Sequence, residues 1–229
     1  MSSYIHHEYP KTVGRKDFWK QIKRTVNGQE VSPDDIKIII KNVSKGLMLS
    51  KSDTVLDLGC GNAALASYFY KKINRYHGVD FSKYLLEIAN DFFYISELTT
   101  FQELDLGVSP ESIHNLQNYN KVLMYGVASY FSKRQLCKIF ETVLINNENV
   151  QRIYIGNVPN VNFSDNFFAR RNLIKTDLKN PNSSIGVWWD PDEISQILIS
   201  MGYSCKIFLM PKDFYGYPYR FDILAMRNE

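Results

Sequence analysis

Cysteine is scarce in this sequence of 229 residues, and the few that occur are scattered. The three are Cys60, Cys137 and Cys205, an odd number with no Cys-x-x-Cys pair or Cys/His cluster among them. This spacing indicates neither a disulfide framework nor a zinc site, and we expect no bound metal.

Charge of one sign and long apolar runs are also lacking. The net charge of +3 is spread along the chain and is too weak a bias to indicate a nucleic acid or a membrane surface as partner. The first residues, MSSYIHHEYPKTVGRK, contain no apolar run of the signal-peptide kind, and no later stretch is long enough to span a bilayer. A cytoplasmic protein acting on a small molecule is the expectation, with its oligomeric state left open.

What the sequence does contain is an apolar fraction of 45%, typical of a globular protein, and an alternation of strand and helix patterns. Apolar spacing predicts a helix around DFWKQIKRTV, and Ser32 and Pro33 begin a second helix that Gly46 is expected to end. Strands are expected at DTVLDLG, RYHGVDFS, TTFQELDL, NKVLMYG and QRIYIGNV, with helices between most of them, the first being NAALASYFYKK. The alternation predicts an α/β fold with a mostly parallel sheet.

The alternation of strands and helices is interrupted at residues 158–186. This segment is rich in polar and turn-forming residues and is interpreted as an inserted lid or substrate loop. A capped helix at DPDEISQILISMGY and two strands, expected to pair antiparallel, complete the chain. The division predicted is a helical N-terminal cap over residues 1–52 and one α/β domain over residues 53–229.

A Gly-x-Gly corner follows the first long strand, in VLDLGCGNAALASYF. Gly59, Gly61 and Ala64 fit a pattern in which glycines let a ligand approach the backbone, although a packed corner without a ligand uses glycine in the same way. Asp57, Asp80 and Asp105 stand at the ends of three successive strands, and these ends meet at one edge of a parallel sheet.

The position of Asp57 distinguishes between two kinds of cofactor. A carboxylate so close to the corner repels the pyrophosphate of a dinucleotide. S-adenosyl-L-methionine carries a sulfonium, an ammonium and one carboxylate, so its net charge is positive. Such a ligand is attracted to a site lined by acidic side chains. Asp80 is placed to accept hydrogen bonds from both hydroxyls of a ribose, and Asp105 from an adenine amino group.

The segments VLDLGCGNAAL, GVDFSKYLLEIA and QELDL together resemble the class I S-adenosyl-L-methionine-dependent methyltransferases, over about residues 53–157. The resemblance implies a Rossmann-like, seven-stranded, mostly parallel sheet with an antiparallel last strand. It also implies contacts to the methionine part near Asp57 and to the ribose near Asp80, with Tyr125 and Gly126 near the sulfonium. The full set of cofactor-binding residues that follows is Asp57, Gly59, Cys60, Gly61, Asp80, Phe81, Ser82, Asp105, Leu106, Tyr125 and Gly126.

The N-terminal segment GRKDFWKQIKRTVNGQ and the C-terminal segment YPYRFDILAMR also resemble those of small methyltransferases of bacterial surface-polysaccharide biosynthesis. That likeness implies O-methylation of a sugar, a sugar phosphate or a phosphate-bearing precursor of a capsule. The chain departs from many relatives at Ala63, where they have glycine.

Few side chains qualify as a general base, and transfer to a phosphate or carboxylate oxygen needs none. Tyr125 and His7 are the catalytic candidates, against the alternatives that the tyrosine packs on the cofactor and the histidine is solvated. Candidate acceptor-binding residues are the cations and aromatics expected around the crevice, where solvated or core roles are the competing interpretation: Arg15, Arg24, Arg170, Trp188, Tyr219 and Arg220.

Three other functions stay open. A base-specific nucleic-acid methyltransferase is disfavoured because MYGVASYF stands where an Asn/Asp-Pro-Pro-aromatic motif is expected. A nicotinamide dehydrogenase is disfavoured by Asp57 and by the fifty residues that precede the corner. A non-catalytic protein that keeps the cofactor as part of a scaffold is the remaining alternative.

Overall fold

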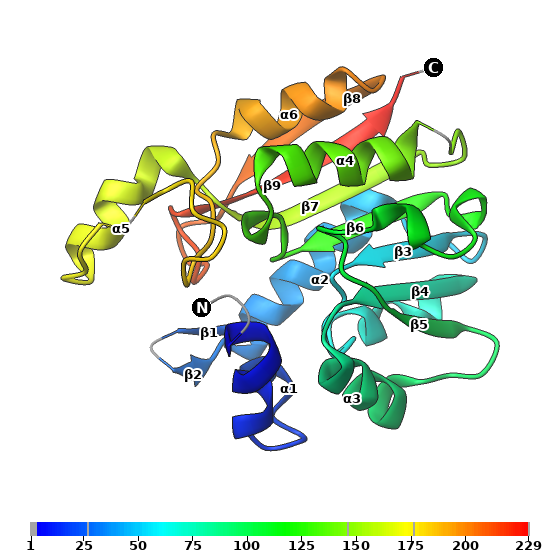
Figure 1. The fold of residues 1–229 in the computed structure, drawn as a ribbon, viewed down its shortest axis with the longest axis horizontal. Helices are drawn as coiled ribbons and strands as arrows, with labels where there is room; N and C mark the ends of the chain where they lie inside the picture. Colours follow the sequence, from blue (N-terminus) through cyan, green and yellow to red (C-terminus); the bar gives the residue numbers. More distant parts are fainter. Residues whose placement is uncertain (1–3, 27, 146, 176, 229) are drawn as a thin grey trace.

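The computed structural model describes residues 4–26, 28–145, 147–175 and 177–228. Its centre is a seven-stranded sheet in the order β5-β4-β3-β6-β7-β9-β8 (Figure 1). The strands are β3 (Thr54–Leu58), β4 (Arg75–Asp80), β5 (Thr99–Glu103), β6 (Lys121–Tyr125), β7 (Arg152–Pro159), β8 (Tyr203–Leu209) and β9 (Arg220–Arg227).

In this sheet β9 runs opposite to the other six strands. β3 to β7 pair in parallel, and β9 is antiparallel to both β7 and β8. This order and the reversed last strand confirm the predicted Rossmann-like architecture and the antiparallel closing pair.

Helices cover both faces of the sheet. On one face lie α4 (Lys133–Leu144) and α6 (Pro191–Ile199), which pack on alternate residues of the central strands such as Leu56 and Leu58 (Figure 1). On the other face, α2 (Pro33–Leu47) packs with Val55 and Leu123, and α3 (Lys83–Phe93) contributes Ala89 to the same core. Since strand side chains alternate between faces, Asp57 points to the face that α2 covers.

Three local expectations differ from the structure. α2 does not end at Gly46 but continues to Leu47, where Met48 adopts the left-handed conformation. Gly46 is needed for packing, because a Cβ there would lie 2.6 Å from the Tyr154 ring. The segment after the corner forms only the short 3-10 turns η3 (Ala66–Tyr68) and η4 (Tyr70–Lys72) in place of a helix.

The third difference is in the N-terminal extension, which is helical in α2, η1 (Tyr4–Glu8) and η2 (Tyr9–Thr12). The helix expected around DFWKQIKRTV is reduced to α1 (Phe18–Gln21). The chain then reverses through Lys23, whose φ is 52°, into the hairpin β1 (Thr25–Val26) and β2 (Gln29–Glu30).

The segment between β7 and α6 lies beyond the carboxyl ends of the strands. It contains η8 (Val161–Phe163) and α5 (Ser164–Arg170), and Figure 1 shows α5 projecting from the body of the protein. Among the described residues, the structure has no helix with the length and apolar character needed to cross a bilayer.

Candidate active site

The glycine corner is fastened to the end of β4 by backbone hydrogen bonds. Gly59 N and Cys60 N both donate to Val79 O, at 2.7 and 3.0 Å, and Gly61 N donates to Asp80 Oδ2 at 2.8 Å. Gly59 and Gly61 have φ of +78° and +57°, where a side chain would be strained. The corner therefore has the tight geometry that the sequence predicts.

Asp80 is a buried carboxylate at the end of β4. Its second oxygen accepts from Ser82 N at 2.9 Å, so each oxygen has one backbone donor. Each oxygen keeps further accepting capacity for ligand hydroxyls. Burial raises the pKa of Asp80, although hydrogen bonds from Ser82 and Gly61 oppose the rise.

Asp57 is buried near the end of β3, and Tyr76 Oη donates to its Oδ2 at 2.7 Å. Burial raises the pKa of Asp57 to about 7, and the negative charge of Asp80 adds to the rise. Arg24 acts in the opposite direction and lowers it. Asp57 is thus a carboxyl group whose charge depends on pH near neutrality.

Arg24 is the member of the N-terminal extension that reaches the crevice. Its side chain is 7% exposed, its guanidinium lies 4.6 Å from the Tyr125 ring, and its Nη1 has no hydrogen-bond partner among the described residues. A Cβ on Gly126 would lie 3.4 Å from Arg24 Nη2. A buried guanidinium with an unpaired nitrogen is a binding group for an anion.

The N-terminal extension covers the corner from outside. Asn62 Nδ2 donates to Phe18 O and to Gln21 Oε1, both at 2.8 Å. A Cβ on Gly61 would lie 2.9 Å from Ile22 Cγ2, so the glycine makes room for this contact. The segment around DFWKQIKRTV, which the sequence predicts to be helical, is therefore packed on the glycine corner.

His6 and His7 lie at the same edge. The His7 ring is 4.5 Å from the Phe81 ring, and the His6 ring is 4.2 Å from that of Tyr130. Burial lowers the pKa of His6 to about 4, and its Nε2 is buried without a partner among the described residues. His6 is a neutral imidazole with a free nitrogen, which sequence reasoning did not separate from His7.

Asp222, on β9, was not anticipated. It is 2% exposed and accepts hydrogen bonds from Tyr154 Oη and, at 2.8 Å, from Asn157 N. Asn157 has a φ of 59° at the irregular register between Ile155 and Val158. Asp222 thereby fixes a strained bulge near the carboxyl end of β7, next to Arg24 and Tyr125. Its only sequence signal is an acid inside an apolar strand, RFDILAM.

Several predicted residues are placed away from this centre. Arg15 forms an ion pair with Asp91 on α3, and Arg170 is an exposed residue at the end of α5. Trp188 is 1% exposed and packs with Phe168 and Tyr219, so its ring is core and has no face free for a sugar. Asp105 and Leu106, by contrast, follow Leu104, whose N donates to Asp80 O at 2.9 Å, so they stay near the end of β4. Asp105 is exposed and its Oδ1 accepts from Gly107 N, whereas Leu106 is buried.

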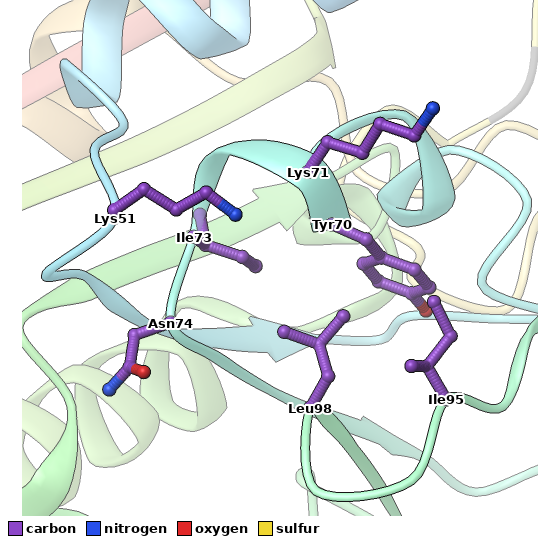
Figure 2. A pocket seen from close by; sticks show the side chains of 7 residues that line it. All are labelled: Lys51, Tyr70, Lys71, Ile73, Asn74, Ile95 and Leu98. Carbon is purple, nitrogen blue, oxygen red and sulfur yellow. The ribbon is translucent and has the colours of Figure 1, made fainter.

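Pockets elsewhere do not coincide with the corner. One of about 420 Å³ lies at the opposite edge of the sheet, before β3, β4 and β5, with Lys51, Asn74 and Leu98 in its wall (Figure 2). Within the described ranges, no three His, Cys, Asp or Glu side chains gather in a way that would hold a metal ion.

Comparison with known proteins gives a match to one family model. Residues 56–124 match the family model described as a methyltransferase domain. No curated protein sequence matches the chain.

Solved structures share the fold. Magnesium protoporphyrin IX methyltransferase from Synechocystis PCC 6803 with bound S-adenosylhomocysteine has 17% identity and a TM-score of 0.63, covering 95% of this chain and 100% of that one. An S-adenosylmethionine-dependent methyltransferase from Clostridium acetobutylicum has 13% identity and a TM-score of 0.62, covering 87% and 93%. The methyltransferase domain of bacterial CtHen1 has 19% identity and a TM-score of 0.59, covering 84% and 97%.

The chain therefore has the fold of the class I S-adenosyl-L-methionine-dependent methyltransferases, and its residues 56–124 match a methyltransferase domain, which implies S-adenosyl-L-methionine as the cofactor.

Proposed function

We propose that this protein transfers a methyl group from S-adenosyl-L-methionine to an oxygen of a small anionic or sugar-type acceptor. The resemblance of its N-terminal and C-terminal segments to small methyltransferases of surface-polysaccharide biosynthesis supports a cytoplasmic role in making a capsule or another surface polysaccharide. The acceptor would be a sugar, a sugar phosphate or a phosphate-bearing precursor.

The observation that carries the methyl-donor part is the presence of two buried side chains of opposite charge, Asp57 and Arg24, at the corner. The amino-acid end of S-adenosyl-L-methionine has one ammonium and one carboxylate, and these two side chains offer the complementary charges. A dinucleotide would bring two phosphate charges to a corner that holds Asp57 and Asp80.

The bound cofactor supplies a methyl group on a positively charged sulfur, ready for displacement. Asp80 and the corner would hold the ribose, and Leu106 and Asp105 would hold the adenine, as the resemblance implies. Val127, whose side chain fills the space next to Gly59, and Tyr125 close the region proposed for the sulfonium against water.

Three side chains are assigned to the chemistry at the acceptor hydroxyl: Tyr125, His7 and His6. Burial raises the pKa of Tyr125, so its hydroxyl stays protonated and positions a ligand as a hydrogen-bond donor. His7 keeps its proposed catalytic role at the edge of Phe81. His6, neutral and with an unpaired nitrogen, is placed to hydrogen-bond the acceptor hydroxyl, whereas its pKa of about 4 makes it a weak base.

The test is turnover. Purified protein incubated with S-adenosyl-L-methionine and a panel of sugars and sugar phosphates is expected to release S-adenosylhomocysteine and to yield a methyl ether or ester. Binding of the cofactor without turnover on any acceptor in such a panel would favour the scaffold alternative. Transfer to a nitrogen of a nucleic acid would replace the proposal.

A further inference from the structure

Two arginines, Arg220 and Arg171, have no acidic partner among the described residues. They lie near Tyr125 and Tyr130, in a region that we call the acceptor side of the site. Arg220, at the start of β9, donates from Nη1 to Asn157 O at 3.3 Å. The other charged or polar groups that act on it are the hydroxyls of Tyr125, Tyr130 and Tyr215, and the guanidinium of Arg171. Within the described part of the chain, neither arginine forms an ion pair with a carboxylate.

Arg171 is held near Arg220 by aromatic rings. Its guanidinium lies 4.1 Å from the Phe167 ring and 5.0 Å from the Tyr219 ring. Tyr219 is buried and directly precedes Arg220, and Phe167 belongs to α5. The segment after β7 thus contributes the exposed Arg171, in place of Arg170, to the acceptor side.

The electrostatic setting differs from that of Arg24. The positive charge of Arg24 acts on two buried carboxyl groups, Asp57 and Asp222. The charges of Arg171 and Arg220 act on each other and on tyrosines, and guanidinium groups remain protonated even when burial disfavours the charge. Two neighbouring like charges call for a ligand that carries more than one negative charge.

The hydroxyls around Arg220 are donors. Burial raises the pKa of Tyr130 and of Tyr215, so both keep their protons. Tyr215 Oη donates to Asn157 Oδ1 at 3.5 Å, a long hydrogen bond that a phosphoryl oxygen would replace. Tyr130 also contacts the His6 ring, which places this cluster beside the imidazole assigned to the acceptor hydroxyl.

We propose that Arg220 and Arg171, together with the hydroxyls of Tyr130 and Tyr215, bind a phosphoryl group of the methyl acceptor. This inference rests on the proposed function and narrows the acceptor to a phosphate-bearing molecule. It divides the arginines by role: Arg24 serves the cofactor carboxylate, and Arg220 and Arg171 serve the acceptor.

The experiment is calorimetric titration of inorganic phosphate into protein loaded with S-adenosylhomocysteine. Wild-type protein is expected to bind phosphate, and Arg220→Met to weaken this binding at least about tenfold, the loss typical of a charge-assisted hydrogen bond. Arg171→Met, at an exposed position, should weaken it by about fivefold without affecting folding. Arg75→Met, an exposed arginine at the opposite edge of the sheet, is the matched control.

Affinity for S-adenosylhomocysteine should be unchanged in all three variants. Phosphate binding that is absent from wild type, or equal in wild type and in both Arg220→Met and Arg171→Met, would overturn the phosphoryl site and leave the cofactor assignment intact. Acetate binding as tightly as phosphate at these arginines would replace a phosphoryl group with a carboxylate. If the wild-type protein did not bind S-adenosylhomocysteine, that result would instead overturn the proposed function.

Discussion

At the residue scale, the site depends on buried charges that a ligand completes. Asp57 is held by one hydrogen bond from Tyr76 and by the field of Arg24, and Arg24 keeps one nitrogen without a partner among the described residues. A protein pays for burying such groups unless they are paired. The buried charges of Asp57 and Arg24 are consistent with a ligand that carries both a positive and a negative group, as the amino-acid end of the cofactor does.

Cofactor affinity should depend on pH through Asp57. Its pKa is raised to about 7 in the folded protein, so the group is mostly protonated at pH 6 and mostly ionised at pH 8. A cationic ligand binds the ionised form, so affinity for S-adenosyl-L-methionine should fall about five- to tenfold from pH 8 to pH 6. Calorimetry at both pH values measures it.

Asp57→Asn is the control for that pH effect, since it cannot ionise. Its affinity should be low and nearly equal at the two pH values. A wild-type affinity that does not change between them would contradict the role of Asp57.

Asp80→Asn should weaken S-adenosylhomocysteine binding by at least about tenfold, because an amide replaces one accepting oxygen by a donor. Asparagine nearly preserves the shape but keeps an acceptor for only one of the two backbone donors, Gly61 N and Ser82 N. Asp80→Ala leaves both donors unpaired and should also lower the melting temperature. Wild-type affinity in Asp80→Asn would refute the ribose assignment.

At the element scale, the N-terminal extension shows what periodicity can and cannot predict. Phe18, Trp19, Ile22 and Val26 have helical spacing, yet the helix ends at Gln21. The chain turns because Arg24 enters the crevice and Ile22 packs on Gly61, contacts that a single sequence does not reveal. The Asn-Gly pair at 27–28 was an available hairpin signal.

The short turns after the corner have a similar origin. Ala63 occupies a left-handed conformation with φ of 60°, and its N–H donates to Cys60 O. That conformation ends regular helix geometry where the apolar pattern NAALASYFYKK predicts a helix. The tight corner and the packing of Asn62 under α1 override local propensity here.

Asn62→Ala should loosen the extension from the corner. It removes hydrogen bonds to Phe18 O and Gln21 Oε1 from a fully buried side chain, at a cost of about 2 kcal/mol in the free energy of unfolding. Dissociation of S-adenosylhomocysteine, followed by stopped-flow fluorescence, should become faster. Ser67→Ala, which removes a bond from Ser67 Oγ to Ala64 O on the same loop, is the comparison. Equal dissociation rates in the two variants would contradict a covering role for the extension.

At the scale of the whole molecule, the mostly parallel sheet and the edge at which Asp57 and Asp80 lie follow from the sequence. Alternating patterns predict a parallel sheet, and acids at successive strand ends must then meet at one edge. The acceptor side is different, because Arg24, Arg171, Arg220 and Asp222 come from distant segments. Only the fold shows that Asp222 and Asn157 join these arginines, and that Trp188 is core.

The central claim is that this corner selects a methyl donor over a dinucleotide, and competitive calorimetry tests it most directly. Titration with S-adenosylhomocysteine should give one site per chain with a dissociation constant on the order of micromolar, and NAD should neither bind nor compete. Tight binding of NAD at this site, or no binding of any adenosyl ligand, would contradict the account.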